Sequence, residues 1–382
     1  MFEGDRLLRV PGPTPVPDRV VRAGSRPMLY HRGAEFVAIF ERSVARLKKL
    51  FETEGDVFIL AGSGTLAMES AVANLVAPGD EAIVASGGKF GERWVELVQS
   101  FGGRPVVVSY PYGRGVEPQQ IAEAMERHPA AKVVFATQNE SSTTVLNDIE
   151  SIARVVRDRG GILAVDAVSS LGGAPLEMDA WGVDVVVSGS QKCLMLPPGL
   201  SFVAVNQRAW ERSLAVNASR YYADWRRYRE AQAKGQTPYT PAVSLIVALD
   251  EALAMLEEEG KEARLARHRL MMTMVREGLK ALGFDLYVED RWASPTVTAA
   301  TGGGVDPSQL VKAVKARTGV VLSGGQGELK GKIFRVGHMG AVTPLDMATT
   351  LSAIELGMAA LGKAPRLGAG VGRALEVWSA WA

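Results

Sequence analysis

Lys192 is the residue of this sequence whose surroundings best suit covalent chemistry. It lies in Ser188–Gly199, a segment rich in small residues that follows a strand-like apolar run over 183–187. Ligands of open α/β sheets bind at such strand ends. Burial there lowers the pKa of a lysine and leaves a neutral amine that can attack a carbonyl. On this segment alone, a solvated surface lysine is an equally good interpretation.

A second candidate, Asp166, favours the chemical interpretation. It ends an apolar run over 162–165 and precedes small residues, as expected of a buried strand with an acid at its carboxyl end. The spacing between Asp166 and Lys192 leaves room for one crossover and the next parallel strand. Pyridoxal phosphate needs such a pair, because the lysine forms a Schiff base with its aldehyde while the acid keeps its pyridine nitrogen protonated. A helix N-cap is the alternative role for Asp166.

The elements that would position these residues alternate along the chain as they do in a parallel sheet. Predicted helices at 35–53, 117–128 and 148–158 separate apolar runs at 57–60, 81–86, 104–109, 131–136 and 162–166. A long helical stretch over 243–282, broken near Gly260, leads to shorter strands and helices beyond residue 284. The pattern predicts an α/β domain followed by a compact α+β domain.

The turn Gly62–Ala67, between the first strand and a helix, has two interpretations. Backbone N–H groups at such a helix start bind anions such as phosphate. The pattern Gly-x-Gly-x-x-Ala also matches the dinucleotide fingerprint. The second strand, over 81–86, lacks the acid at its end that the fingerprint requires. A nicotinamide-dependent dehydrogenase is therefore only a remote alternative.

Composition limits the other classes of function. The chain has 382 residues, a net charge of +1 and 47% hydrophobic residues, which gives no electrostatic reason to expect nucleic acid or an acidic membrane surface. Its one cysteine, Cys193, allows no disulfide within the chain and fits a reducing compartment. No apolar run reaches membrane-spanning length, and the first residues lack the order of a signal peptide. We expect a cytoplasmic protein without a metal site.

Taken together, these segments resemble the class V aminotransferases of fold type I, most closely the alanine–glyoxylate and serine–pyruvate aminotransferase group. The likeness runs from the proline-rich segment 11–15 to about Gly340. This fold implies a large domain over 16–262, with a mainly parallel seven-stranded sheet between helices. It also implies a smaller α+β domain over 263–382 and an N-terminal arm over 1–15.

The resemblance implies the cofactor pyridoxal 5′-phosphate, bound to Lys192 as an internal aldimine. Asp166 would hold the pyridine nitrogen, and Phe90 would stack on the ring in the place of the tryptophan usual in the family. Thr65 stands where the better-known members have a histidine. The remaining cofactor-binding residues that the resemblance implies are Ser63, Gly64, Ser141 and Gln191.

Four further residues are implied for the substrate and for a neighbouring subunit. Arg335 would bind the substrate α-carboxylate, a role that suits a bidentate guanidinium, although an arginine exposed on an edge strand explains the sequence equally well. The arm would bring Gly12 close to the substrate. Tyr239 and Thr240 would lie in a loop that reaches the cofactor phosphate of the neighbouring subunit, so that the active site of a homodimer is shared.

The implied reaction is transamination from a small amino acid, serine or alanine, to a 2-oxo acid, glyoxylate or pyruvate. Arg335 is the one obvious carboxylate-binding arginine, and this favours donors with a single carboxylate. The alternatives within the class are transamination of 2-aminoethylphosphonate or ureidoglycine, or a lyase reaction. Gln191 before the lysine, with Cys193 directly after it, speaks against a cysteine desulfurase. A non-enzymatic subunit of a larger complex is a further alternative.

Overall fold

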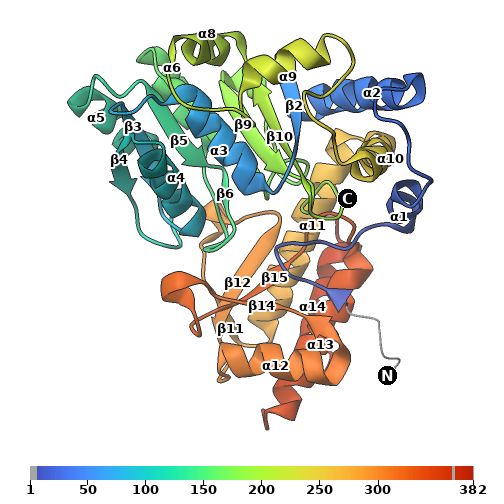
Figure 1. Ribbon diagram of the computed structural model, residues 1–382. Helices are drawn as coiled ribbons and strands as arrows, with labels where there is room; N and C mark the ends of the chain where they lie inside the picture. Colours follow the sequence, from blue (N-terminus) through green and yellow to red (C-terminus); the bar gives the residue numbers. More distant parts are fainter. Residues whose placement is uncertain (1–6, 364–365, 382) are drawn as a thin grey trace.

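The computed structural model describes residues 7–363 and 366–381. Figure 1 shows an upper unit, in which helices flank a seven-stranded sheet, above a lower unit with a four-stranded sheet. A long helix, α11 (Lys261–Ala281), runs from the upper unit into the lower one. The functional residues predicted from the sequence come from both units and from the N-terminal segment between them.

The upper sheet confirms the predicted mainly parallel arrangement of seven strands. Its order is β2-β10-β9-β8-β5-β3-β4. Only β10 is antiparallel to its neighbours, so the other strands all end at one edge. The strands are β2 (Asp56–Ala61), β3 (Glu81–Ser86), β4 (Arg104–Ser109), β5 (Val133–Thr137), β8 (Ile162–Asp166), β9 (Val185–Gly189) and β10 (Leu200–Val205).

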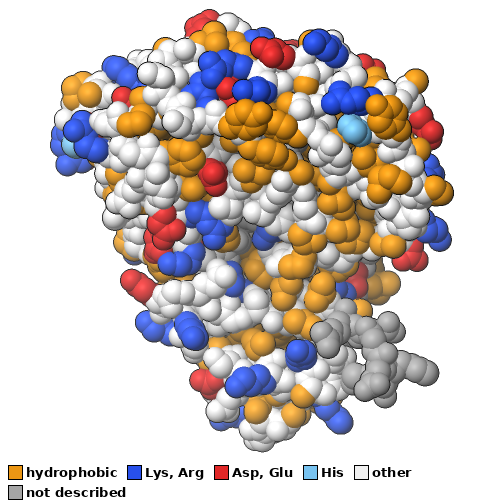
Figure 2. Space-filling model, in the orientation of Figure 1, with side chains coloured by type: hydrophobic (Ala, Val, Ile, Leu, Met, Phe, Trp, Pro, Cys, Tyr) orange, Lys and Arg blue, Asp and Glu red, His pale blue; other side chains and the backbone are white. Residues whose placement is uncertain are grey.

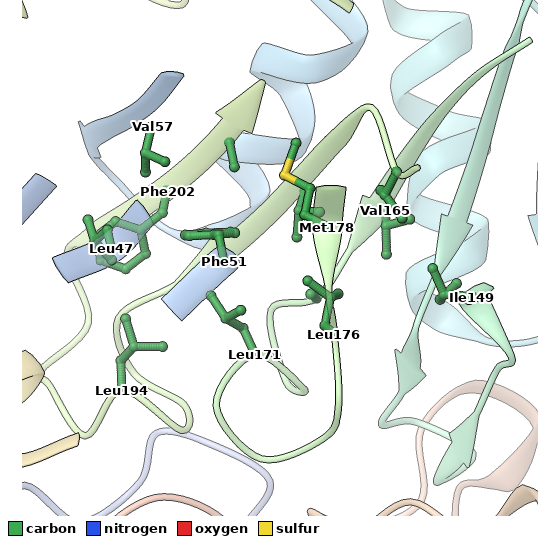
Figure 3. Packing of buried hydrophobic residues seen from close by; sticks show 14 of the residues in the cluster. Leu47, Phe51, Val57, Ile149, Val165, Leu171, Leu176, Met178, Leu194 and Phe202 are labelled. Atoms are coloured by element: carbon green, nitrogen blue, oxygen red, sulfur yellow. The ribbon is translucent and has the colours of Figure 1, made fainter. Parts of the chain in front are cut away.

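Helices cover both faces of this sheet, because its strands are apolar on both sides. Successive residues of β2 alternate between two cores, with Val57 in one and Phe58 in the other. In the first core, Leu47 and Phe51 pack near Phe202 of β10 (Figure 3). The helices are α1 (Asp18–Gly24), α2 (Ala34–Phe51), α3 (Gly64–Leu75), α4 (Lys89–Ser100), α5 (Pro118–Arg127), α6 (Ile149–Asp158), α7 (Met178–Trp181), α8 (Gln207–Ala215), α9 (Trp225–Gln232) and α10 (Val243–Glu259).

The lower unit has a core of its own. Leu270 of α11, Phe284, Phe334 and Leu351 all belong to it. Its antiparallel sheet has the order β11-β12-β15-β14. The division after residue 262 stays a prediction, which this change of core supports. The elements are β11 (Phe284–Leu286), β12 (Val297–Gly302), α12 (Pro307–Thr318), β14 (Ser323–Gly324), β15 (Phe334–Gly337), α13 (Pro344–Ala360) and α14 (Ala369–Ser379).

The N-terminal segment is bound to the lower unit, although the chain then continues into the upper one. Its strand β1 (Leu7–Leu8) pairs in parallel with β13 (Val320–Val321). The backbone N–H of Gly337 donates to the carbonyl of Arg9 at 2.7 Å, and the Arg9 side chain forms an ion pair with Asp346. Neither strand of the β1–β13 pair belongs to the larger sheets, so this contact is a separate anchor for the arm.

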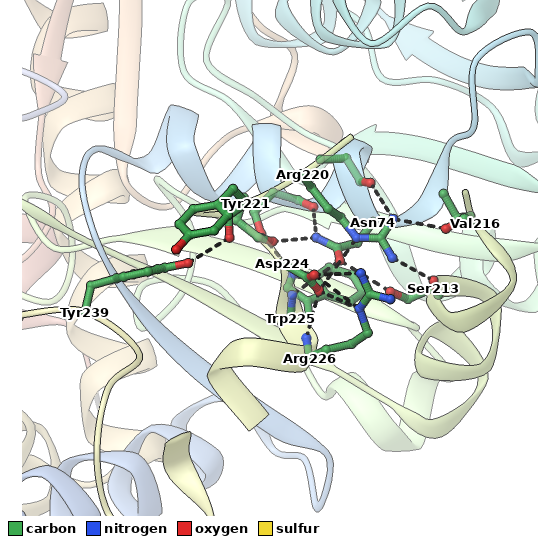
Figure 4. A network of polar contacts seen from close by, with 12 residues as sticks. Asn74, Ser213, Val216, Arg220, Tyr221, Asp224, Trp225, Arg226 and Tyr239 are labelled. Atoms are coloured by element: carbon green, nitrogen blue, oxygen red, sulfur yellow. Dashed lines mark hydrogen bonds and ion pairs between the residues drawn. The ribbon is translucent and has the colours of Figure 1, made fainter. Parts of the chain in front are cut away.

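A buried polar network fixes the segment between α8 and α9 against α3 (Figure 4). The Asn74 amide oxygen accepts from the backbone N–H of Trp225 at 3.3 Å, and the Trp225 indole donates to Ser70 at 2.8 Å. Arg220 forms an ion pair with Asp224 at 3.7 Å, with only 1% of the Arg220 side chain exposed. These contacts tie the irregular stretch between α8 and α9 to α3.

No helix in the part of the chain that the structure describes is long and apolar enough to cross a membrane.

Phe202→Ala should lower the free energy of unfolding by about 3–5 kcal/mol, because it removes a fully buried ring from the centre of the upper unit. Leu214→Ala is the matched control, since Leu214 is 58% exposed and such changes stay within about 0.5 kcal/mol. Urea unfolding followed by circular dichroism measures both. A loss for Phe202→Ala no larger than that of the control would show that the ring does not support the core.

Candidate active site

The structure brings Lys192 and Asp166 to one cavity of about 510 Å³. Asp166 is the last residue of β8, and Lys192 lies in the turn after the neighbouring parallel strand β9. Because both strands end at the same edge of the sheet, the two side chains reach the same crevice. This is the juxtaposition that the sequence predicts from their spacing.

Burial shifts the ionisation of both groups towards their neutral forms. Asp166 is 3% exposed and accepts a hydrogen bond from the backbone N–H of Val168 at 2.8 Å. Desolvation raises the pKa of its carboxyl to about 7, although this hydrogen bond opposes the shift. Desolvation lowers the pKa of Lys192 to about 8, opposed by the charge of Asp166. The neutral, nucleophilic form of the amine is therefore reached at a lower pH than in an exposed lysine.

The N-terminal arm crosses directly over Lys192. The Lys192 amine donates to the carbonyl of Pro11, and the hydroxyl of Thr14 donates to the carbonyl of Lys192 at 2.9 Å. Gly12 has a φ of +113°, and a Cβ added there would lie 2.6 Å from the Lys192 nitrogen. Glycine is thus required by both the backbone conformation and the close approach. This places Gly12 at the mouth of the cavity, as the sequence predicts.

The start of α3 lines another side of the cavity. Ser63 is the N-cap residue and Gly64 and Thr65 form the first turn, and no side chain in the described ranges caps the helix there. The first N–H groups of such a helix are available to an anion. A Cβ on Gly64 would lie 2.7 Å from a methyl of Val168, which is too close for two carbon atoms. A larger residue at the start of α3 would therefore collide with the segment that follows β8.

Phe90 lines the cavity from the first turn of α4, and Arg93 lies beside it. The Arg93 guanidinium carbon is 4.9 Å from the centre of the Phe90 ring, and Arg93 donates to the hydroxyl of Thr65 at 3.3 Å. Arg93 was not among the residues expected from the sequence. Its spacing of three residues from Phe90 on a helix was the signal available, since such residues share a face. Arg93 and Arg335 thus both line this cavity, and the expectation that Arg335 is the carboxylate-binding arginine stays a prediction.

Arg335 reaches the cavity from β15, between β12 and β14, and is 4% exposed. This excludes the alternative of an exposed arginine on an edge strand. Its guanidinium donates to the carbonyls of Ser141 at 2.6 Å and Gly324 at 3.0 Å. Burial lowers the pKa of Arg335 to about 10, opposed by the charge of Glu140. No carboxylate of the described residues forms a salt bridge with it, so the guanidinium can still bind an anion.

The remaining predicted residues are divided between two places. Ser141 and Gln191 line the cavity, and the buried Gln191 amide oxygen has no hydrogen-bond partner among the described residues. Tyr239 and Thr240 instead line a separate small cavity with Tyr222. Within one chain they do not belong to the Lys192 site, and their predicted contact with a neighbouring subunit stays a prediction.

In the described ranges, no group of three or more His, Cys, Asp or Glu side chains lies close enough to hold a metal ion.

A buried amine of lowered pKa beside a buried carboxylate suits covalent chemistry on a carbonyl group. Fold and cavity together thus define an α/β protein with a lysine placed for this chemistry. The model of the family Aminotransferase class-V matches residues 9–351, and the chain belongs to this family. It is an aminotransferase by family.

Relatives of known sequence or structure match almost the whole chain. The soluble hydrogenase small subunit of Synechococcus sp. is 41% identical, covering 98% of each chain. The serine–glyoxylate aminotransferase of Methylorubrum extorquens is 34% identical, covering 97% of this chain and 95% of its own. The crystal structure of pyridoxamine–pyruvate aminotransferase from Mesorhizobium loti has a TM-score of 0.94 at 33% identity and covers both chains completely. This structure confirms the predicted fold.

In the ligand-free protein, acetylation of Lys192 should follow a titration with a midpoint near pH 8. The reason is that burial favours the neutral amine, which is the reactive form. Competitive labelling with acetic anhydride, read by peptide mass spectrometry, gives this midpoint. Asp166→Asn should move it lower still, because the charge of Asp166 stabilises the ammonium form. A midpoint at the ordinary lysine value of about 10.4 would contradict a desolvated amine.

Proposed function

We propose that this aminotransferase uses pyridoxal 5′-phosphate to move an amino group from serine or alanine to glyoxylate or pyruvate. The observation that carries the proposal is that the half-buried Lys192 and the buried Asp166 line one cavity. The names of the relatives support the substrate class, since one is a serine–glyoxylate aminotransferase and another a pyridoxamine–pyruvate aminotransferase. A cytoplasmic location remains part of the proposal, supported by the single cysteine of the chain.

The residues that line the cavity fit this cofactor. The first turn of α3, with Arg93 beside it, would hold the phosphate, and Phe90 would stack on the ring. The buried Asp166 carboxyl accepts one hydrogen bond, from the backbone N–H of Val168. It can accept another from a protonated ring nitrogen. The unpartnered amide oxygen of Gln191 lies in the same cavity. When bound, the cofactor supplies a ring that withdraws electrons from the substrate Cα.

The chain's own groups divide the remaining work. The Lys192 amine would hold the cofactor through its aldehyde carbon. Once the substrate has released it, the amine would take the proton from the substrate Cα and deliver it to that former aldehyde carbon, on the far side of the amino nitrogen. Asp166 holds the proton of the ring nitrogen, and this cation stabilises the ionised form of its carboxyl. Arg335 binds the substrate α-carboxylate. The arm at Pro11 and Gly12 excludes water from the amine.

Two arginines line the cavity, and the proposed amino donor depends on which of them binds a substrate carboxylate. Arg335 is placed for the α-carboxylate, whereas Arg93 contacts Thr65 at the proposed phosphate site. We therefore assign Arg93 to the cofactor phosphate, which keeps donors with one carboxylate as the proposed class. Transamination of 2-aminoethylphosphonate or ureidoglycine, and a lyase reaction, are the alternatives that use the same cofactor.

A homodimer with a shared site is the second part of the proposal. Hydrophobic side chains gather around α3 and α9 on the face shown in Figure 2. Tyr239 donates to the carbonyl of Tyr221 at 2.9 Å and stacks on Tyr222 at 4.8 Å, and Thr240 beside it is exposed. Large hydrophobic side chains that are exposed in the single chain include Met28, Tyr30, Tyr221 and Tyr222. Such a surface is typical of a subunit interface.

A role as a hydrogenase subunit is the alternative that the name of one relative raises. Iron–sulfur clusters are held by several cysteine thiolates, and this chain has only Cys193, which is buried. Burial raises the pKa of the Cys193 thiol to about 12, so it is a poor source of thiolate. The chain alone cannot supply a four-cysteine ligand set, and no observation favours this role over transamination.

With pyridoxal 5′-phosphate added, the protein should absorb in the visible range through cofactor bound to Lys192. Serine or alanine should remove this absorbance, and glyoxylate or pyruvate should restore it, because amino transfer runs in two reversible halves. Lys192→Gln should bind the cofactor without the visible absorbance. Absorbance that neither donor changes would overturn the substrate class and leave the two alternative donors to be assayed. Its complete absence would overturn the proposed function.

Thr240→Ala should raise the dissociation constant of pyridoxal 5′-phosphate about tenfold, the effect of losing one hydrogen bond to a charged group. Cofactor titration by absorbance measures this constant, and light scattering shows that the dimer persists. Thr349→Ala on the exposed face of α13 is the control. Unchanged cofactor affinity in an intact dimer would mean that the loop does not reach the neighbouring site.

A further inference from the structure

Glu140 is a fully buried carboxylate for which the proposed reaction has no direct use. One of its oxygens accepts the backbone N–H groups of Phe90 at 2.9 Å and Gly91 at 3.0 Å. The other accepts the backbone N–H of Ser142 at 3.2 Å and the hydroxyl of the same residue. No lysine, arginine or histidine of the described residues forms a salt bridge with it. Keeping an unpaired carboxylate in such a place is costly, and burial raises its pKa.

These hydrogen bonds join elements that are distant in sequence. Phe90 and Gly91 belong to the first turn of α4, whereas Glu140 lies in β6 (Asn139–Glu140) after strand β5. Ser142 adds a second link, because its hydroxyl accepts the backbone N–H of Lys89 at 3.0 Å. The start of α4, which carries the ring of Phe90 into the cavity, is therefore bound to the loop of Ser141.

The same loop also holds the arginine of the lower unit. The carbonyl of Ser141, the residue next to Glu140, accepts from the Arg335 guanidinium at 2.6 Å. The charge of Glu140 opposes the effect of burial on Arg335 and helps to keep it protonated. One carboxylate thus lies between the aromatic ring on one side of the cavity and the anion-binding arginine on the other.

A glycine at the start of α4 makes room for the Glu140 carboxylate, and the N-cap position of the helix has no capping side chain as a result. The N-cap position of α4 is Gly88, where serine, threonine or aspartate would normally cap a helix, and no described side chain of α4 itself caps it. A Cβ on Gly88 would collide with the carboxyl group and Cγ of Glu140. Its φ of 170° is open to any residue, so the glycine serves to make space for Glu140.

We propose that Glu140 is a positioning residue that fixes Phe90 relative to Ser141 and Arg335, and so sets the cofactor-stacking and carboxylate-binding groups together. The inference rests on the proposed function, because that function gives Phe90 and Arg335 their roles. It implies that cofactor affinity and the KM of the amino donor change together when the carboxylate is removed or displaced. A merely structural role predicts a change in stability alone.

The test uses two variants that reach the same contact from opposite sides. Glu140→Ala removes the acceptor, and Gly88→Ala displaces it without substituting any cofactor- or substrate-binding residue. Gly372→Ala in α14 is the control, because no described atom lies within 4 Å of the added Cβ. The full-length protein is measured in three ways: amide hydrogen exchange over residues 88–94 without cofactor, the dissociation constant of pyridoxal 5′-phosphate, and the KM for serine.

Both variants should exchange the amides of Phe90 and Gly91 faster than the wild type and the control. Both should raise the cofactor dissociation constant and the KM together, by roughly tenfold or more, as expected for lost hydrogen bonds to a charged acceptor. Glu140→Gln keeps an oxygen for Phe90 and Gly91, and should recover most of the exchange protection and cofactor affinity. It also provides a folded variant if Glu140→Ala fails to accumulate.

The proposal is overturned if the variants lower the melting temperature but leave amide exchange, cofactor affinity and KM within threefold of the wild type. It is also overturned if Glu140→Gln loses as much exchange protection and cofactor affinity as Glu140→Ala. An oxygen that accepts from Phe90 and Gly91 would then not be enough to position the site. A wild-type protein that binds no pyridoxal 5′-phosphate would instead refute the proposed function. The exchange measurement, which needs no cofactor, would still report on the contact itself.

Discussion

The whole site depends on the burial of an amine and a carboxyl group in one crevice. Water would keep Lys192 and Asp166 charged, and its removal pushes the pKa of the amine down to about 8 and that of the carboxyl up to about 7. The charge of Asp166 opposes this shift of the Lys192 pKa, and the backbone N–H of Val168 opposes the shift of the Asp166 pKa. Because both pKa values lie near neutral pH, a bound charged group, such as a ring nitrogen or a phosphate, can change the protonation state of Lys192 and Asp166. Parallel strands, the crossing arm and Arg335 all serve to close this crevice.

The antiparallel strand β10 has a part in this closure. Because β10 returns beside β9, the lysine is carried by a short connection between two neighbouring strands and not by a long crossover. The Ser190 hydroxyl donates to the carbonyl of Pro197 at 2.7 Å and accepts the backbone N–H of Leu200 at 3.2 Å. Leu194 and Leu196 are fully buried beneath the turn. These contacts fix the backbone of the turn, so that only the side chain of Lys192 is free to move.

The parts of the site that follow from local patterns could be predicted from the sequence. Strand ends are visible as apolar runs, and parallel strands bring those ends together, so Lys192 and Asp166 could be paired from their positions in the chain. Arg93 had one signal, its spacing of three residues from Phe90 on a helix, but an arginine next to charged residues also has the pattern of a solvent-facing side chain, and this second pattern hid it. Glu140 was missed for a different reason. Its carboxylate binds backbone N–H groups some 50 positions away, and every residue except proline has such a group, so the sequence does not mark them.

The pairing of β1 with β13 has a consequence for the order in which the molecule can be completed during synthesis. Leu7–Leu8 are made before the upper sheet, but their partner, Val320–Val321, is made after it. Domains fold as they emerge, so the upper sheet can form while the arm still has nothing to pair with. The segment that covers Lys192 is thus fastened only after the lower unit exists. The β1 strand is thus among the last described elements to be placed, and a nascent chain has its lysine uncovered until β13 has been made.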